Sequence, residues 1–155
     1  MASNHSLKVL AEKIFGKRVK ISSLNKLLNE INITRKLSPC IFNTAEEGVG
    51  HFIAAAPLDE RSVVLFDPLA SKITEIIMEP LNNIFNNVYI NHDQIQDEKS
   101  EFCALFCLGF INHFLKGGGM SSYFEMFTKD NLRYNDQVIY DYLMLEIVKK
   151  KKIAM

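Results

Sequence analysis

Apolar residues recur along the first thirty positions at helical spacing. In residues 6–15 and again in residues 24–31, leucine, isoleucine and alanine stand three and four positions apart, which places them on one face of a helix. Ser22 or Ser23 lies directly before the second run and can cap it, because a serine hydroxyl accepts a hydrogen bond from the first free backbone N–H groups. The pattern therefore predicts two amphipathic helices at the start of the chain.

Four short apolar runs in the middle of the chain predict β-strands. These runs lie at residues 40–43, 51–56, 62–66 and 88–90. A polar turn at residues 57–61 separates the second run from the third, so we expect these two strands to form a hairpin. A loop rich in Glu and Gly, residues 44–50, precedes the hairpin.

Helical spacing returns in the second half of the chain. Residues 71–85 predict a helix, although Pro80 should kink or split it. Residues 102–115 form the most apolar helical stretch, which is typical of a central, buried helix. A short helix is expected at residues 121–127, and a last helix follows, capped by Asn135 or Asp136.

Helices, a group of strands and further helices follow one another, and this order is typical of the α+β class. A chain of 155 residues suits one domain with one core. We therefore expect a single domain, residues 1–155, in which a small mixed sheet packs on the central helix.

The charges balance, so the composition does not indicate a protein that binds nucleic acid through an overall positive charge. Eighteen basic and eighteen acidic residues give a formal net charge of zero, so no overall positive field attracts the protein to nucleic acid. The one dense basic run is 149–152. It is interpreted as a solvated helix end, where cations suit the helix dipole, or as a contact for phosphates or a nuclear import signal.

Cysteine usage and hydropathy indicate a reducing compartment. Three cysteines, an odd number, argue against a disulfide framework, and no pair has the spacing of zinc ligands, so no metal site is expected. Core packing is expected for Cys40 and Cys107. No stretch reaches the roughly twenty apolar residues that span a bilayer, and the first six residues lack a signal-peptide core. We expect an intracellular protein without a membrane segment.

Four residues stand in an order that suits a thiol hydrolase: His51, Asp67, Gln96 and Cys103. Cys103 falls in the first turn of the apolar helix, where the helix dipole favours the thiolate nucleophile. His51 begins an apolar strand and can act as the base. Asp67 ends a strand and can accept a hydrogen bond from the imidazole Nδ1, while the amide of Gln96 can donate to an oxyanion.

Each of these residues also has an ordinary structural interpretation. A cysteine at a helix start is often buried core, a histidine is often a surface or core residue, and an aspartate before Pro68 often only forms a turn. A glutamine in a polar loop is usually solvated, and Gln94 is a nearby competitor for the oxyanion role. The hypothesis depends on the four residues occurring together.

Together the motifs resemble those of the adenovirus-type cysteine endopeptidases, or adenains. The resemblance extends over residues 39–143, and Gln96 stands seven residues before Cys103, as in that family. The similar segments are Cys40-Ile41-Phe42-Asn43-Thr44-Ala45, Gly50-His51-Phe52-Ile53-Ala54, Leu65-Phe66-Asp67-Pro68, Cys103-Ala104-Leu105-Phe106-Cys107 and Asn135 to Leu143. Phe52 replaces the family's tryptophan and Ala104 its glycine, so the chain resembles a shorter, divergent member.

The resemblance implies an adenain-like fold and a viral maturation protease that cleaves capsid and core precursors at Gly-containing sites. Cys103 would be the nucleophile, His51 the base, Asp67 its orienting group and Gln96 the oxyanion donor. It implies action in the host nucleus or virus factory and in the virion.

The human adenovirus enzymes that this chain resembles use a disulfide-linked peptide activator and DNA as cofactors. The activator's cysteine partner would fall near Tyr89, where no cysteine stands, so a disulfide-linked activator is not expected. DNA or another peptide stays open as a cofactor, with a weak DNA contact through Lys149, Lys150, Lys151 and Lys152.

Two alternatives remain at this point. Proteases of ubiquitin-like modifiers (SUMO-type) share the fold and the order of groups, but they usually place the glutamine six residues before the cysteine and follow the cysteine with glycine. The other alternative is an inactive relative that serves as a scaffold. All four groups are present, which favours activity.

Overall fold

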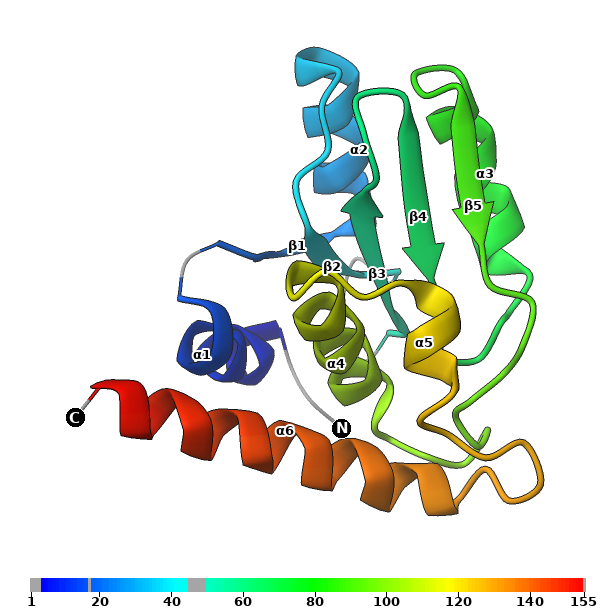
Figure 1. Cartoon of the computed structure of the whole chain (residues 1–155). Helices are drawn as coiled ribbons and strands as arrows, with labels where there is room; N and C mark the ends of the chain where they lie inside the picture. The colour runs from blue at the N-terminus through cyan, green and yellow to red at the C-terminus, as the bar shows by residue number, and fades with distance from the viewer. Residues whose placement is uncertain (1–3, 17, 45–49, 155) are drawn as a thin grey trace.

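The computed structural model describes residues 4–16, 18–44 and 50–154, with side chains described over 7–16, 18–44 and 50–151. In chain order the elements are α1 (Asn4–Phe15), β1 (Lys20–Ser23), α2 (Leu24–Thr34), β2 (Cys40–Asn43), β3 (Phe52–Pro57), β4 (Ser62–Phe66), α3 (Ile73–Asn82), β5 (Asn87–Ile90), α4 (Cys103–Leu115), α5 (Met120–Phe124) and α6 (Tyr134–Ala154). The fold is of the expected α+β class (Figure 1).

The five strands form one mixed sheet in the order β1-β2-β3-β4-β5. The pairs β2–β3 and β3–β4 are antiparallel, and the edge strands β1 and β5 pair in parallel with their neighbours. The predicted hairpin of β3 and β4 is confirmed, with Ala54 opposite Phe66. Its register brings the start of β3 and the end of β4 to the same end of the sheet.

Helices cover both faces of the sheet (Figure 1). Alternate residues of a strand point to opposite faces, so Ala54 and Phe66 pack with α4, whereas Ile53 and Leu65 pack with α2 and α3. The expectation of a sheet packed on one helix was therefore incomplete. The uninterrupted apolar runs of β3 and β4 are explained by burial on both faces.

Several boundaries differ from the predictions. The strand β1 was not predicted, and α6 begins at Tyr134, so Asn135 and Asp136 lie inside its first turn and do not cap it. Ser23 caps α2 as expected, by accepting from the Lys26 N–H at 3.4 Å. Pro80 lies within the last turn of α3 and does not split it. In the predicted loop 44–50, residues 45–49 fall outside the described part.

The most apolar helix, α4, packs on the sheet as predicted. Phe106, Cys107, Leu108 and Ile111 are fully buried, and Phe110 stacks on Phe66 of β4 with ring centroids 4.8 Å apart. Burial of this helix fixes its N-terminal end close to the end of the sheet where β3 begins and β4 ends (Figure 1). Cys103 is the first residue of the helix.

Candidate active site

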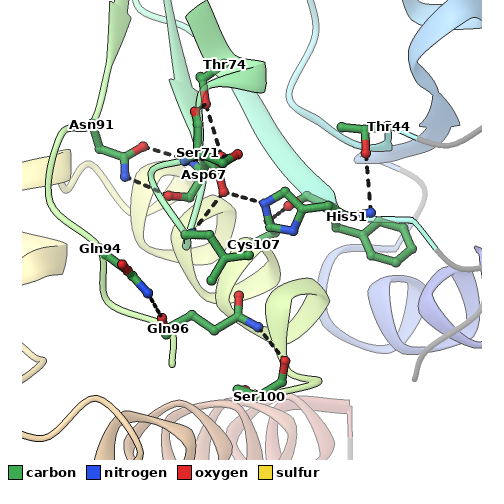
Figure 2. A network of polar contacts seen from close by, with 12 residues as sticks. Thr44, His51, Asp67, Ser71, Thr74, Asn91, Gln94, Gln96, Ser100 and Cys107 are labelled. Atoms are coloured by element: carbon green, nitrogen blue, oxygen red, sulfur yellow. Dashed lines mark hydrogen bonds and ion pairs between the residues drawn. The ribbon is translucent and has the colours of Figure 1, made fainter. Parts of the chain in front are cut away.

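His51 and Asp67 meet at that end of the sheet. His51 immediately precedes β3 and Asp67 immediately follows β4, so the antiparallel register brings them side by side. Figure 2 shows the imidazole facing the carboxylate, and its Nε2 is hydrogen-bonded to Asp67 Oδ1. Thr44 fixes the backbone of His51: its N–H donates to the His51 carbonyl at 2.9 Å, and its hydroxyl accepts from the His51 N–H at 3.3 Å.

The nitrogen that contacts Asp67 differs from the prediction. We expected the carboxylate to accept from Nδ1, but the ring presents Nε2 to Asp67. The contacts with Thr44 hold the backbone of His51 at the start of β3, and the far side of the ring contacts Asp67 at the end of β4. Consequently Nδ1 is the nitrogen left for a partner other than Asp67.

Asp67 is fully buried, and its neighbours satisfy both carboxylate oxygens (Figure 2). Besides His51, Oδ1 accepts from the Leu69 N–H at 2.9 Å. Oδ2 accepts from the N–H and the hydroxyl of Ser71 and from the Thr74 hydroxyl. Burial alone would raise the pKa of Asp67, but the hydrogen bond and the charge of His51, with the other donors, hold the pKa below its usual value. The group is therefore a carboxylate at neutral pH.

Asn91 and Ala70 shape the turn around this carboxylate. The Asn91 amide accepts from the Asp67 N–H at 2.8 Å and donates to the Asp67 carbonyl at 2.7 Å, as a paired strand would. Ala70 adopts φ 49°, a left-handed conformation that costs a non-glycine residue about 1–2 kcal/mol. Strain of this kind is concentrated at functional sites in proteins. Asp67 is thus held in place by contacts that a simple surface turn does not need.

The imidazole of His51 is charged at neutral pH. Burial would lower its pKa, but the interactions with the side chains of Asp67 and Cys103 outweigh burial and raise the pKa of His51 to about 9. The ring is therefore an imidazolium that interacts with a carboxylate on one side and a thiol on the other. An imidazolium beside a thiol stabilises the thiolate.

The three cysteines have different environments. Cys103 is the first residue of α4 and is 4% exposed, and no acidic residue lies in the first turn of that helix. Cys107, one turn later, donates to the Phe52 carbonyl at 3.4 Å, and burial raises its pKa well above the usual value. Burial likewise raises the pKa of Cys40 to about 12. Core packing is confirmed for Cys40 and Cys107, and Cys103 is the cysteine that interacts with His51.

Gln96 is buried in the loop between β5 and α4, contrary to what a solvated loop residue would show. Its amide NH₂ donates to the Ser100 carbonyl at 3.0 Å, while its Oε1 is buried with no partner among the described residues. Leaving an acceptor unpaired costs about 1–3 kcal/mol. Gln94 does not compete for the same place, because its amide donates to the Gln96 carbonyl at 2.7 Å and supports it (Figure 2).

The start of α6 holds this loop through contacts that were not predicted from the sequence. The Ser100 hydroxyl donates to Asp136 at 2.8 Å and accepts from the Phe102 N–H, next to Cys103, at 3.1 Å. Asn135, fully buried, donates to the carbonyls of Ile95 and Thr128 at 2.8 and 2.9 Å. Ser100 therefore connects α6, the Gln96 amide and the start of α4. The Asn135-Asp136 pair is visible in the sequence as a candidate helix cap and, for Asn135, as the start of a segment similar to the adenains, but neither interpretation predicts contacts with this loop.

A hollow of about 650 Å³ opens beside Asn91, on the side of α5. Apolar, polar and charged side chains line it. The lining residues are Ile90, Asn91, His92, Asp93, Met120, Ser121, Phe124, Glu125, Phe127 and Lys129. Its volume lies in the range of small-ligand sites in proteins.

Two further features concern metals and membranes. Among the described residues, no group of three or more His, Cys, Asp or Glu side chains could hold a metal ion. None of the helices in the described ranges combines the length and the apolar character needed to cross a bilayer.

In the basic run 149–152, Lys149 Nζ lies 3.7 Å from a carboxylate oxygen of Glu146, and the side chain of Lys152 falls outside the described residues.

Comparisons with known proteins bear on the fold alone. No protein-family model matches the chain, and no curated protein matches it. Among solved structures, it is similar to the central domain of the uncharacterized Lpg1148 protein from Legionella pneumophila, with a TM-score of 0.52 and 15% identity over 98% of both chains. At this identity the similarity supports a shared fold and carries no activity from one protein to the other.

Proposed function

We propose that the chain is a cysteine endopeptidase with an adenain-like fold. One observation supports this most directly: the imidazole of His51 is bonded to a buried carboxylate and interacts with the Cys103 side chain, and its pKa is about 9. A carboxylate, a charged imidazole and a thiol in that order form the arrangement that activates a cysteine nucleophile.

In the proposed reaction, the Cys103 thiolate attacks the carbonyl carbon of the scissile peptide bond. The carbonyl oxygen becomes an oxyanion, and the His51 imidazolium then gives its proton to the leaving amine as the C–N bond breaks. A thioester remains on Cys103. Neutral His51 next takes a proton from water, the resulting hydroxide attacks the thioester, and the acid product leaves as the thiolate re-forms.

The oxyanion needs donors at the start of α4. The Cys103 N–H has no partner within the helix, because the first N–H groups of any helix lack one. The Gln96 amide donates one N–H to the Ser100 carbonyl. Its second N–H is the proposed donor to the oxyanion. Loss of one such donor typically costs about 3–4 kcal/mol of transition-state stabilisation. Ser100 and Asp136 act as positioning residues, because they hold the loop of Gln96 and the residue before Cys103.

The substrate class comes from the resemblance. The proposed substrates are viral capsid and core precursors cut at Gly-containing sites, in the host nucleus, virus factory or virion. A glycine near the cut suits a partly closed site in which Cys103 is only 4% exposed. The hollow beside Asn91, with its apolar lining residues Ile90, Met120, Phe124 and Phe127, is the proposed pocket for an aliphatic residue upstream of the cut. DNA through Lys149 to Lys152, or a peptide that is not disulfide-linked, is the proposed activator.

Cleavage assays test this proposal. The purified protein is incubated with a panel of Gly-containing precursor peptides and with a ubiquitin-like modifier fusion ending in Gly-Gly, each with and without double-stranded DNA. We expect cleavage of precursor peptides by the wild type and none by the variant Cys103→Ala. Cleavage of the modifier fusion alone would contradict this proposal and support a protease of ubiquitin-like modifiers instead. Absence of any cleavage, with Cys103 no more reactive than Cys107, would favour the scaffold alternative.

A further inference from the structure

The outward face of α6 carries a row of exposed apolar side chains. Tyr140, Met144 and Val148 stand one turn apart and are 47%, 38% and 47% exposed, and Leu145 beside them is 56% exposed. The opposite face of the helix is also apolar, with Ile139 and Leu143 buried against the core. A helix that is apolar on both sides is typical of one with neighbours on both sides.

One charged residue lies beside the first member of this row, and another lies beyond its last member. At 100° per residue, Gln137, Asp141 and Lys151 fall on the same face as Met144. Asp141 lies toward the start of the helix and accepts from the Gln137 amide at 2.8 Å, so these two form one polar patch. Lys151 lies toward the other end and is exposed. The face therefore carries an acidic group beside Tyr140, apolar side chains at Met144 and Val148, and a basic group beyond Val148.

This distribution of charge is complementary to itself in one orientation. When two such helices pair antiparallel about Met144, Val148 of one lies opposite Tyr140 of the other. Lys151 then comes opposite Gln137, within one turn of Asp141, and the same contact occurs twice because the pairing is two-fold symmetric. In a parallel pair Lys151 would face Lys151, and like charges in that position repel.

We propose that two copies of this chain associate through the outward face of α6, antiparallel, with a two-fold axis near Met144. One helix face buries less than the roughly 1,200–2,000 Å² of a stable interface, so the dimer is expected to be weak and reversible, with a dissociation constant of about 10–500 µM. The dimer does not depend on the proposed peptidase activity, since none of its contacts involves Cys103 or His51.

Sedimentation velocity over about 5–500 µM protein tests the proposal. The wild type should show a sedimentation coefficient that rises with concentration. Met144→Glu should raise the dissociation constant at least about tenfold, because it places two carboxylates at the axis. Ile76→Glu is the matched control: Ile76 is 66% exposed on α3, away from this face, and its replacement should leave self-association unchanged. Circular dichroism confirms that both variants fold.

Charge exchange tests the antiparallel register. Asp141→Lys and Lys151→Glu should each raise the dissociation constant about 3- to 10-fold, because each dimer contains the contact twice. The double variant should return to within about threefold of the wild type, since the charges are again complementary. A wild type that stays monomeric, self-association that survives Met144→Glu, loss of it in Ile76→Glu, or no recovery in the double variant would each overturn the proposal.

Discussion

Asp59 and Asp67 both stand in turns, at the two ends of the β4 strand, but their surroundings differ. Asp59 is exposed, and its carboxylate accepts from the Arg61 N–H at 2.7 Å, as turn-forming aspartates commonly do. Asp67 is fully buried and bonded to His51, Ser71 and Thr74. Burying a carboxylate costs several kcal/mol unless donors surround it, so the many contacts of Asp67 indicate a role beyond turn formation.

The same difference holds for the cysteines at the two ends of the sheet. Cys40 opens β2 near the hairpin turn, packs among apolar side chains under α2 and α3, and has a pKa of about 12. Cys103 lies at the other end and interacts with a charged imidazole. The cysteine at one end of the sheet therefore packs in the core, whereas the cysteine at the other end lies beside a group that can activate it.

The largest expected effect separates these two cysteines. Cys103→Ala should reduce kcat by at least about 10⁴-fold, because no other side chain replaces the nucleophile. Cys40→Ala should leave kcat within about twofold and lower the free energy of unfolding by about 1–2 kcal/mol through the cavity it leaves. Peptide turnover and urea unfolding of both variants measure this. A Cys103→Ala protein that still turns over, or a Cys40→Ala protein that does not, would contradict the comparison.

The two aspartates provide the next test. Asp67→Asn should lower kcat by about 10²- to 10⁴-fold, because the amide no longer holds the charged imidazole. Asp59→Asn should leave kcat within about twofold, since its exposed turn contact is retained by the amide oxygen. Turnover of a fluorogenic peptide by the two variants measures the difference.

The pH profile sharpens the test of Asp67. His51 must be protonated to supply the leaving amine, and its pKa is about 9, so wild-type activity should fall as the pH rises through about 9. Asp67 raises the pKa of His51, so in Asp67→Asn this fall should move to lower pH. An alkaline limb that stays in place in Asp67→Asn would show that Asp67 does not control the imidazole.

A smaller effect is expected for Ser100. Ser100→Ala removes the bonds to Asp136 and to the Phe102 N–H but leaves the backbone contact with Gln96, so kcat should fall about tenfold while KM stays the same. Ser100→Thr should restore most of the rate. The matched control is Ser62→Ala at the hairpin-turn end, which loses a 3.1 Å bond with Asn87 and should change stability only. Equal losses of kcat in both variants would contradict a positioning role for Ser100.

Much of the fold could be predicted from the sequence, because apolar spacing is a local signal. The strand β1 could not, since its four residues contain one large apolar side chain, Ile21, and the strand forms through parallel pairing with β2. The second helical layer was also missed. A run such as that of β4 has no polar alternation, and it shows burial on both faces only when the helices on each side are known.

The main residues of the candidate site could be predicted, but not the residues that support them. The presence of His51, Asp67 and Cys103 in this order predicts thiol chemistry, because a thiol hydrolase needs a base, a group that orients the base and a cysteine nucleophile. Asn91 and Asn135 act over 24 and 40 positions along the chain, and single polar residues of this kind carry no periodic signal. The choice between Nδ1 and Nε2 depends on how the start of β3 orients the ring, which only the folded sheet determines.

The most direct test of the central claim is the rate at which iodoacetamide alkylates each cysteine of the native protein at pH 7, followed by peptide mass spectrometry. If His51 activates Cys103, residue 103 should react at least about tenfold faster than Cys40 and Cys107, and His51→Ala should remove most of that advantage. Equal rates for the three cysteines, or a fast Cys103 whose rate does not change in His51→Ala, would contradict the account.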